Sequence, residues 1–204
     1  MMLDTFGIVT TGASLAAVLT ATLGGRAAPL RDRTVLAGLA GAWVGLVVAL
    51  TAGGYVANLP VFAALFVVSL VAAPFVWRDV APQTMVALNV LRVLGVSFLL
   101  LAYAGQISGP FPYFAGIGDI ITGLLALPTT LRLSTRGIAD PRVLAWNVFG
   151  LLDLVVAVTL GVSTRPPAIS TLPWSLIPLV LVPVFATGHI LLLARAAAVR
   201  RAIA

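Results

Sequence analysis

One apolar stretch decides the fold of this chain: Thr84-Met-Val-Ala-Leu-Asn-Val-Leu-Arg-Val-Leu-Gly-Val-Ser-Phe-Leu-Leu-Leu-Ala-Tyr-Ala104. An α-helix rises 1.5 Å per residue, so about 20 apolar residues cross a hydrocarbon core roughly 30 Å thick. Arg92 stands near the middle of the stretch. A charge at that depth costs on the order of 2.5–3.5 kcal/mol on insertion scales, so it is normally paired or functional. The stretch therefore predicts a membrane helix whose single charge needs a partner.

The composition of the whole chain supports a membrane location. Of the 204 residues, 61% are hydrophobic and only 9% are charged, against roughly 25% charged in an average soluble domain. So few charges cannot cover a water-exposed surface. The sequence predicts an all-α integral membrane protein with a single transmembrane domain over residues 1–204.

Seven stretches are long and apolar enough to span a bilayer. They predict a bundle of seven transmembrane helices with these approximate bounds: Phe6–Leu23, Thr34–Val56, Pro60–Trp77, Thr84–Ala104, Pro112–Leu131, Val143–Val162 and Trp174–Ala194. The first stretch does not look like a signal peptide, because no positive charge precedes it.

The basic residues predict the topology. All twelve are Arg, the six acids are all Asp, and the net charge is +6. Alternate loops after the first, third and fifth stretches and the C-terminal tail hold nearly all of the Arg residues outside the helices, and the other loops hold only Arg165. Cytoplasmic loops collect Lys and Arg, so we expect the N-terminus outside and the C-terminus inside a bacterial inner membrane. The same rule explains the basic charge better than nucleic-acid binding does.

Small residues and prolines mark places where helices pack closely or bend. Gly41 and Gly45 form a GxxxG pattern in the second stretch. Such glycines let helices approach each other, and we expect packing within the chain, the alternative being a homodimer. Pro178 and Pro183 predict a kink or local unwinding in the last helix. In transporters, broken helices often mark a binding site.

Two carboxylates face the charge of Arg92 at similar depth. Counted from the loop ends, Arg92, Asp119 and Asp153 all fall in the middle third of the membrane, so we expect Arg92 within salt-bridge reach of Asp119 or Asp153. One Arg and two Asp leave one surplus negative charge, which needs a protonated carboxyl, a bound cation or water. The trio is either structural glue between helices or part of a transport or binding site, and these roles are compatible.

If transport is the role, we expect Asp153 to carry the proton. Gly118 and Gly123 beside Asp119 indicate close packing there, whereas Asn89, Asn147 and His189 lie near the level of Asp153. These three residues complete the predicted polar site.

His189 is the only histidine and gives a second interpretation. We favour a histidine that is hydrogen-bonded to a neighbouring helix. The alternative is a haem ligand, which would need a second axial ligand from elsewhere. One His with two Asp is a minimal metal site at unsuitable depths, so we predict no metal and no other cofactor.

Several chemistries are excluded by what the chain lacks. Without Lys it cannot hold retinal through a Schiff base, and without Cys it has no disulfide or thiolate site. No HExxH, GxSxG or P-loop motif occurs, and there is no Glu. The sequence gives no reason to expect an enzyme.

Three motifs resemble those of a group of small, uncharacterised bacterial multi-pass membrane proteins. They are Phe114-Ala-Gly-Ile-Gly-Asp119, Trp146-Asn-Val-Phe-Gly-Leu-Leu-Asp153 and Leu176-Ile-Pro-Leu-Val-Leu-Val-Pro183 followed by His189. The resemblance covers about the last 120 residues. It implies that Arg92 and the polar residues of these motifs act as one set, and it implies no substrate.

These observations favour a small transporter or permease that handles a proton, an ion or a small solute in the lipid bilayer. A haem-binding redox protein using His189 is the first alternative. A structural or accessory subunit of a membrane complex is the second.

Overall fold

The computed structural model describes residues 2–24, 30–77 and 80–203, and these residues form helices joined by short turns, with no strand among them. The elements in chain order are α1 (Met2–Gly24), α2 (Leu30–Ala52), η1 (Tyr55–Ala57), α3 (Leu59–Trp77), α4 (Pro82–Leu88), η2 (Asn89–Gly95), α5 (Val96–Tyr103), α6 (Phe111–Arg136), α7 (Pro141–Thr164), η3 (Pro167–Ser170), η4 (Ile177–Leu181) and α8 (Val182–Ile203).

Within the described part of the chain, six helical segments are long and apolar enough to cross a membrane. They are Thr34–Ala52, Leu59–Trp77, Pro82–Tyr103, Phe111–Arg136, Pro141–Thr164 and Ile177–Ala202. They correspond to the second to seventh predicted helices. The first predicted helix lies within α1. Of the Arg residues used to predict the topology, Arg26 and Arg78 lie outside the described residues.

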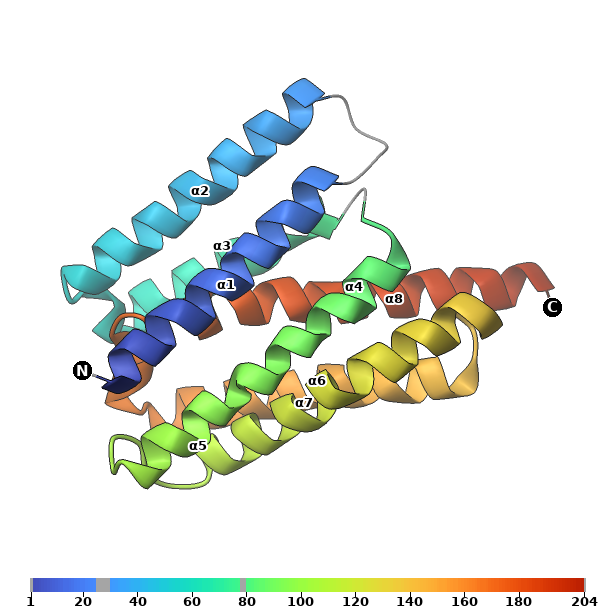
Figure 1. Cartoon of the computed structure of the whole chain (residues 1–204). Coiled ribbons are helices and arrows are strands. Elements are labelled where there is room, and N and C mark those ends of the chain that lie inside the picture. The colour runs from blue at the N-terminus through green and yellow to red at the C-terminus, as the bar shows by residue number, and fades with distance from the viewer. Residues whose placement is uncertain (1, 25–29, 78–79, 204) are drawn as a thin grey trace.

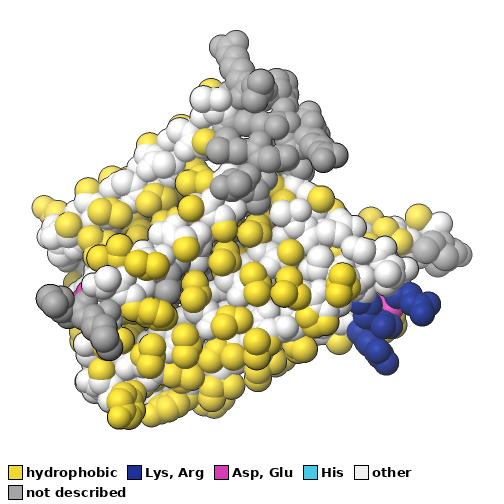
Figure 2. Space-filling view, viewed as in Figure 1, with side chains coloured by type: hydrophobic (Ala, Val, Ile, Leu, Met, Phe, Trp, Pro, Cys, Tyr) yellow, Lys and Arg dark blue, Asp and Glu magenta, His cyan; other side chains and the backbone are white. Residues whose placement is uncertain are grey.

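Figure 1 shows the helices running roughly along one direction, with α2 at one edge of the bundle. Helix α6 packs against α4, η2 and α5 on one side and against α7 on the other, while α8 packs against α3 and α7. On the face seen in Figure 2, hydrophobic side chains cover the middle of the molecule, and the visible basic side chains gather at one end.

The segment that carries Arg92 is helical throughout. The sequence predicted one α-helix here, but the structure differs. It is α-helical in α4, becomes a 3₁₀-helix in η2 and returns to α-helix in α5. Asn89 Nδ2 donates to Met85 O at 2.9 Å. In an α-helix, this carbonyl would accept from the backbone N–H of Asn89. The backbone N–H of Asn89 bonds to Val86 O instead. A 3₁₀ run of seven residues is unusually long, and such runs inside helices often mark functional segments.

The irregularity predicted for the last helix is confirmed, although its start is different. Trp174 lies in a turn, and the helix begins with the π-helical η4, followed by α8. Pro183 lacks the N–H that would reach Leu179 O in an α-helix. Ser69 Oγ of α3 donates to that carbonyl at 2.5 Å, so α3 satisfies the group that the proline leaves.

The expectation that Gly41 and Gly45 pack within the chain is wrong. A Cβ added at either glycine would meet no atom of the described residues within 4 Å. Instead, α2 contacts its neighbours through Trp43, whose Nε1 donates to Ser69 Oγ at 2.8 Å, and through the buried Val47. Nothing in the structure tests the homodimer alternative.

Candidate functional site

Arg92 lies at the centre of a buried polar cluster built by η2, α6, α7 and α8. Its Nε donates to Asp119 Oδ1 at 2.6 Å, and its second terminal nitrogen donates to Asp153 Oδ2. The prediction that Arg92 reaches one of the two carboxylates is confirmed, and the structure shows that it contacts both. Only 2% of its side chain is exposed, against 14% for Asp119 and 8% for Asp153. The guanidinium fork therefore joins three helical segments in the interior of the bundle.

The remaining contacts of Arg92 fix the state of His189. The first terminal nitrogen of Arg92 lies 3.2 Å from Gly150 O and 3.1 Å from His189 Nε2. Arginine only donates, so Nε2 must accept, and Nδ1 must carry the proton. That Nδ1 donates to Asn147 Oδ1 at 2.5 Å, while Asn147 Nδ2 donates to His189 O at 3.1 Å. The structure thus places Asn147 and His189 in the cluster.

Glycine lets the helices approach closely enough for these contacts. A Cβ at Gly150 would lie 2.5 Å from His189 Cε1, so only glycine fits at that point of α7. A Cβ at Gly118 would overlap the carboxylate of Asp153. The close packing predicted at Gly118 is therefore confirmed, and its partner is the carboxylate of Asp153.

Asn89 does not join the cluster in the way the sequence suggested. Its amide nitrogen bonds back to Met85 O, and its Oδ1 is buried with no hydrogen-bond partner among the described residues. Thr122 of α6 lies beside Trp146 and His189. Its Oγ1 is also buried with no hydrogen-bond partner among the described residues. Buried polar atoms without partners usually imply water or a ligand.

A small cavity of about 40 Å³ adjoins Arg92 and Asp119. Water needs roughly 10–15 Å³ of such space, so the cavity can hold water. Helix α1 supplies Thr11 and Ser14 to its wall. Thr11 is 3% exposed, and its Oγ1 has no hydrogen-bond partner among the described residues. The cavity therefore brings hydroxyl side chains of α1 to the space beside the ion cluster.

The structure does not fit His189 as a haem ligand. Both ring nitrogens already make hydrogen bonds, and the residue is completely buried between α7 and α8. Binding iron would require breaking the contact with Arg92 or that with Asn147. Within the described part of the chain, no group of three or more His, Cys, Asp or Glu residues is arranged to hold a metal ion.

A second ion pair lies at the end of the bundle, outside the cluster. Asp140 caps α7 by accepting from Arg142 N at 2.9 Å and Val143 N at 3.4 Å. Arg132 donates to both of its oxygens, at 2.7 and 2.9 Å. The hydrogen bond from Arg132, followed by those from the backbone of α7, lowers the pKa of Asp140. This pair stabilises the α6–α7 connection.

Comparison with known proteins gives one match. The family model described as Domain of unknown function (DUF8737) matches residues 48–197. The chain belongs to this family. No curated protein and no solved structure matches the chain. The DUF8737 match contains Arg92, Asp119, Asp153, Asn147 and His189, and it ends at residue 197, within α8.

Sequence reasoning missed three residues that contribute to this region. Thr11 and Ser14 belong to a helix that reads as generic in sequence, and only the fold brings them to Asp119. Gly150 gave a signal that could have been read, because it lies one helical turn before Asp153, on the face that must pack against another helix.

Proposed function

We propose that this DUF8737 protein is a small membrane transporter in which the cluster of Arg92, Asp119 and Asp153 binds and releases a proton in exchange for a small solute. The observation that carries the proposal is the charge of the cluster. One guanidinium serves two carboxylates, which leaves one surplus negative charge in a bundle with six helical segments long and apolar enough to cross a membrane.

Buried ions in hydrocarbon are expensive unless they are neutralised. A proton on one carboxyl neutralises the surplus charge, and so does a cation that enters beside Asp119. These two states exclude each other, because only one positive charge is missing. Exchange of one for the other is the elementary step of proton-coupled transport. Asp153 is our candidate for the proton carrier, since Asp119, the more exposed carboxylate, borders the cavity that a solute would occupy.

The broken last helix supports the same proposal. Ile177 and Leu181, the two ends of the π-helical η4, both line the small cavity beside Arg92. Unwound segments next to intramembrane charges are common in transporters, where they provide backbone groups for ligands. A purely structural role for the cluster would not require a cavity at this point.

We further propose that α1 is a seventh membrane span, with the N-terminus outside and the C-terminus inside a bacterial inner membrane. The distribution of Arg between alternate loops supports this orientation. A cytoplasm-active reporter fused after Ala204 should be active, and a reporter that works only outside should be active at Ser108. The opposite activities at the two positions would overturn the orientation.

Proteoliposomes test the transport proposal. Purified protein is reconstituted in vesicles that contain a pH-sensitive dye, and inward gradients of alkali cations, small amines or amino acids are applied one at a time. We expect at least one solute to change the internal pH with wild-type protein. Asp153→Asn should abolish the change and still be extracted as folded protein. If no solute moves protons, or if Asp153→Asn behaves like wild type, the proposal is wrong.

A further inference from the structure

An apolar chamber of about 280 Å³ lies inside the described structure and reaches Asp119. Side chains of α3, α5, α6 and α7 line it, together with Ile177, Pro178 and Val182 of η4 and α8. Among the described residues, Asp119 is the only charged one on its wall, and nearly all of the wall surface is apolar. The chamber shares Asp119, Phe98 and several aliphatic residues with the small cavity beside Arg92. The two cavities therefore meet at this carboxylate.

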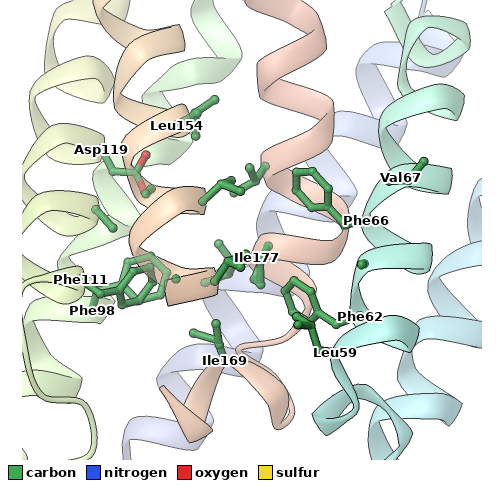
Figure 3. Close-up of a pocket in the computed structure, with 18 residues that line it drawn as sticks. Leu59, Phe62, Phe66, Val67, Phe98, Phe111, Asp119, Leu154, Ile169 and Ile177 are labelled. Atoms are coloured by element: carbon green, nitrogen blue, oxygen red, sulfur yellow. The ribbon is translucent and has the colours of Figure 1, made fainter. Parts of the chain in front are cut away.

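Four phenylalanines line the chamber. Figure 3 shows Phe62 and Phe66 on one side and Phe98 and Phe111 on the other, with Asp119 at one end. Phe98 and Phe111 form an edge-to-face pair with ring centroids 5.2 Å apart. Aromatic faces attract organic cations, and aromatic rings also pack well against apolar groups. The phenylalanines therefore suit the apolar body of a ligand, and the carboxylate suits a positive charge.

We propose that the chamber binds a lipophilic organic monocation, an amine or quaternary ammonium compound, with its apolar body among the phenylalanines and its positive charge toward Asp119. The charge balance selects a cation, because the cluster lacks one positive charge and Arg92 is already paired with both carboxylates. An ammonium group at Asp119 neutralises the cluster. Thr11 and Ser14 line the adjoining small cavity, where a polar substituent or a bound water would need partners.

Other occupants fit less well. A lipid could place its phosphate at Arg165, which lines a further small cavity beside the other end of the chamber, but its acyl chain would then end against Asp119. Covering a carboxylate with hydrocarbon removes its hydration and returns no hydrogen bond or charge. A neutral apolar molecule also leaves the surplus negative charge of the cluster in place, unless a carboxyl takes up a proton. An organic cation packs against the aromatic wall and supplies the missing positive charge.

This inference rests on the proposed transport function for the movement of the solute, but its binding step is tested separately. The probe is benzyltrimethylammonium, and its control is neopentylbenzene, the neutral carbon analogue of the same shape. Equilibrium binding to the full-length protein is measured by calorimetry in lipid nanodiscs. We expect saturable binding of the cation to wild type and at least about thirtyfold weaker binding to Asp119→Asn, as expected when one member of a buried charge pair is removed.

A second variant fills the chamber without changing any charge. Ala157 of α7 lines the chamber, and Ala145 of the same helix is exposed and does not. Ala157→Phe should abolish binding of the cation, whereas Ala145→Phe should leave it unchanged. The elution volume and the unfolding temperature of both variants and of Asp119→Asn are checked against those of wild type.

The outcomes separate the two proposals. Equal binding of the cation and its neutral analogue, or binding that survives both Asp119→Asn and Ala157→Phe, would overturn the cation site. Displacement of a co-purified phospholipid, with no dependence on the charge of the probe, would identify a lipid chain as the occupant and also overturn it. Specific cation binding without any flux in proteoliposomes would keep the site and remove the transport function. Proton movement driven by another solute, without cation binding, would keep the transport function and remove the cation site.

Discussion

The α2 span and the last apolar span are almost equally apolar but are buried to very different extents. The mean hydropathy is 2.1 for Thr34–Ala52 and 2.2 for Ile177–Ala202, whereas 11% of the first window and 56% of the second are buried inside the molecule. The difference lies in a few polar and small residues. The last span offers His189 and a proline-broken backbone to its neighbours. In the α2 span, a Cβ added at any of the glycines would meet no described atom within 4 Å.

The comparison shows that hydropathy identifies a span but does not say what it packs against. Between membrane helices no hydrophobic effect favours one apolar face over another, so hydrogen bonds, charge pairs and close contacts decide the packing. These features are concentrated in η2, α6, α7 and α8. The DUF8737 match begins at residue 48, near the end of α2, and runs through these elements.

Removal of Arg92 should have the largest effect. In Arg92→Gln both carboxylates lose their charged partner, and we expect a loss of about 3–5 kcal/mol in the free energy of unfolding. In the triple variant Arg92→Gln, Asp119→Asn, Asp153→Asn no charge is left unpaired, so most of the stability should return. Unfolding in mixed detergent micelles measures both, with Leu46→Ala on the exposed face of α2 as the control. A triple variant less stable than Arg92→Gln would refute this account of the cluster.

Two glycine substitutions, one in the polar cluster and one in α2, should change the free energy of unfolding by smaller but clearly different amounts. Gly150→Ala places a methyl group against the His189 ring, and such overpacking costs about 1–3 kcal/mol. Gly45→Ala adds the same group where no described atom lies within 4 Å, so its effect should stay within about 0.5 kcal/mol. The same unfolding measurement compares them. Equal losses for the two variants would mean that the open face of α2 is covered by another molecule or that the contact at Gly150 is unimportant.

The smallest expected effect concerns the ion pair at the end of the bundle. The pKa of Asp140 is lowered in the folded protein, chiefly by Arg132, so the pair stabilises the fold above the pKa of an unfolded Asp, about 3.9. That contribution is lost as the pH falls through the lower, folded-state value. Wild type should therefore lose stability in this acidic range relative to Asp140→Asn, measured as the unfolding temperature. Parallel pH profiles for the two proteins would remove this role for Asp140.

The sequence predicted most of the spans and the pairing of Arg92 because hydropathy and buried charge are local and expensive properties. Trp174 was wrongly placed in a helix, since apolar character alone does not distinguish a buried turn from a helical one. The 3₁₀ segment was missed because it depends on a hydrogen bond from Asn89 to its own helix. The chamber at Asp119 was also missed, as its walls come from helices far apart in the chain.

The central claim is that one guanidinium serving two carboxylates leaves one negative charge that a proton or a cation must neutralise. A count of protons tests it most directly. Weakly buffered wild-type protein is titrated with benzyltrimethylammonium while a pH indicator records the change. We expect about one proton to be released per bound cation, because binding and protonation are linked through the same charge, and no release from Asp153→Asn. Cation binding by wild type without proton release, or equal release from Asp153→Asn, would contradict the account.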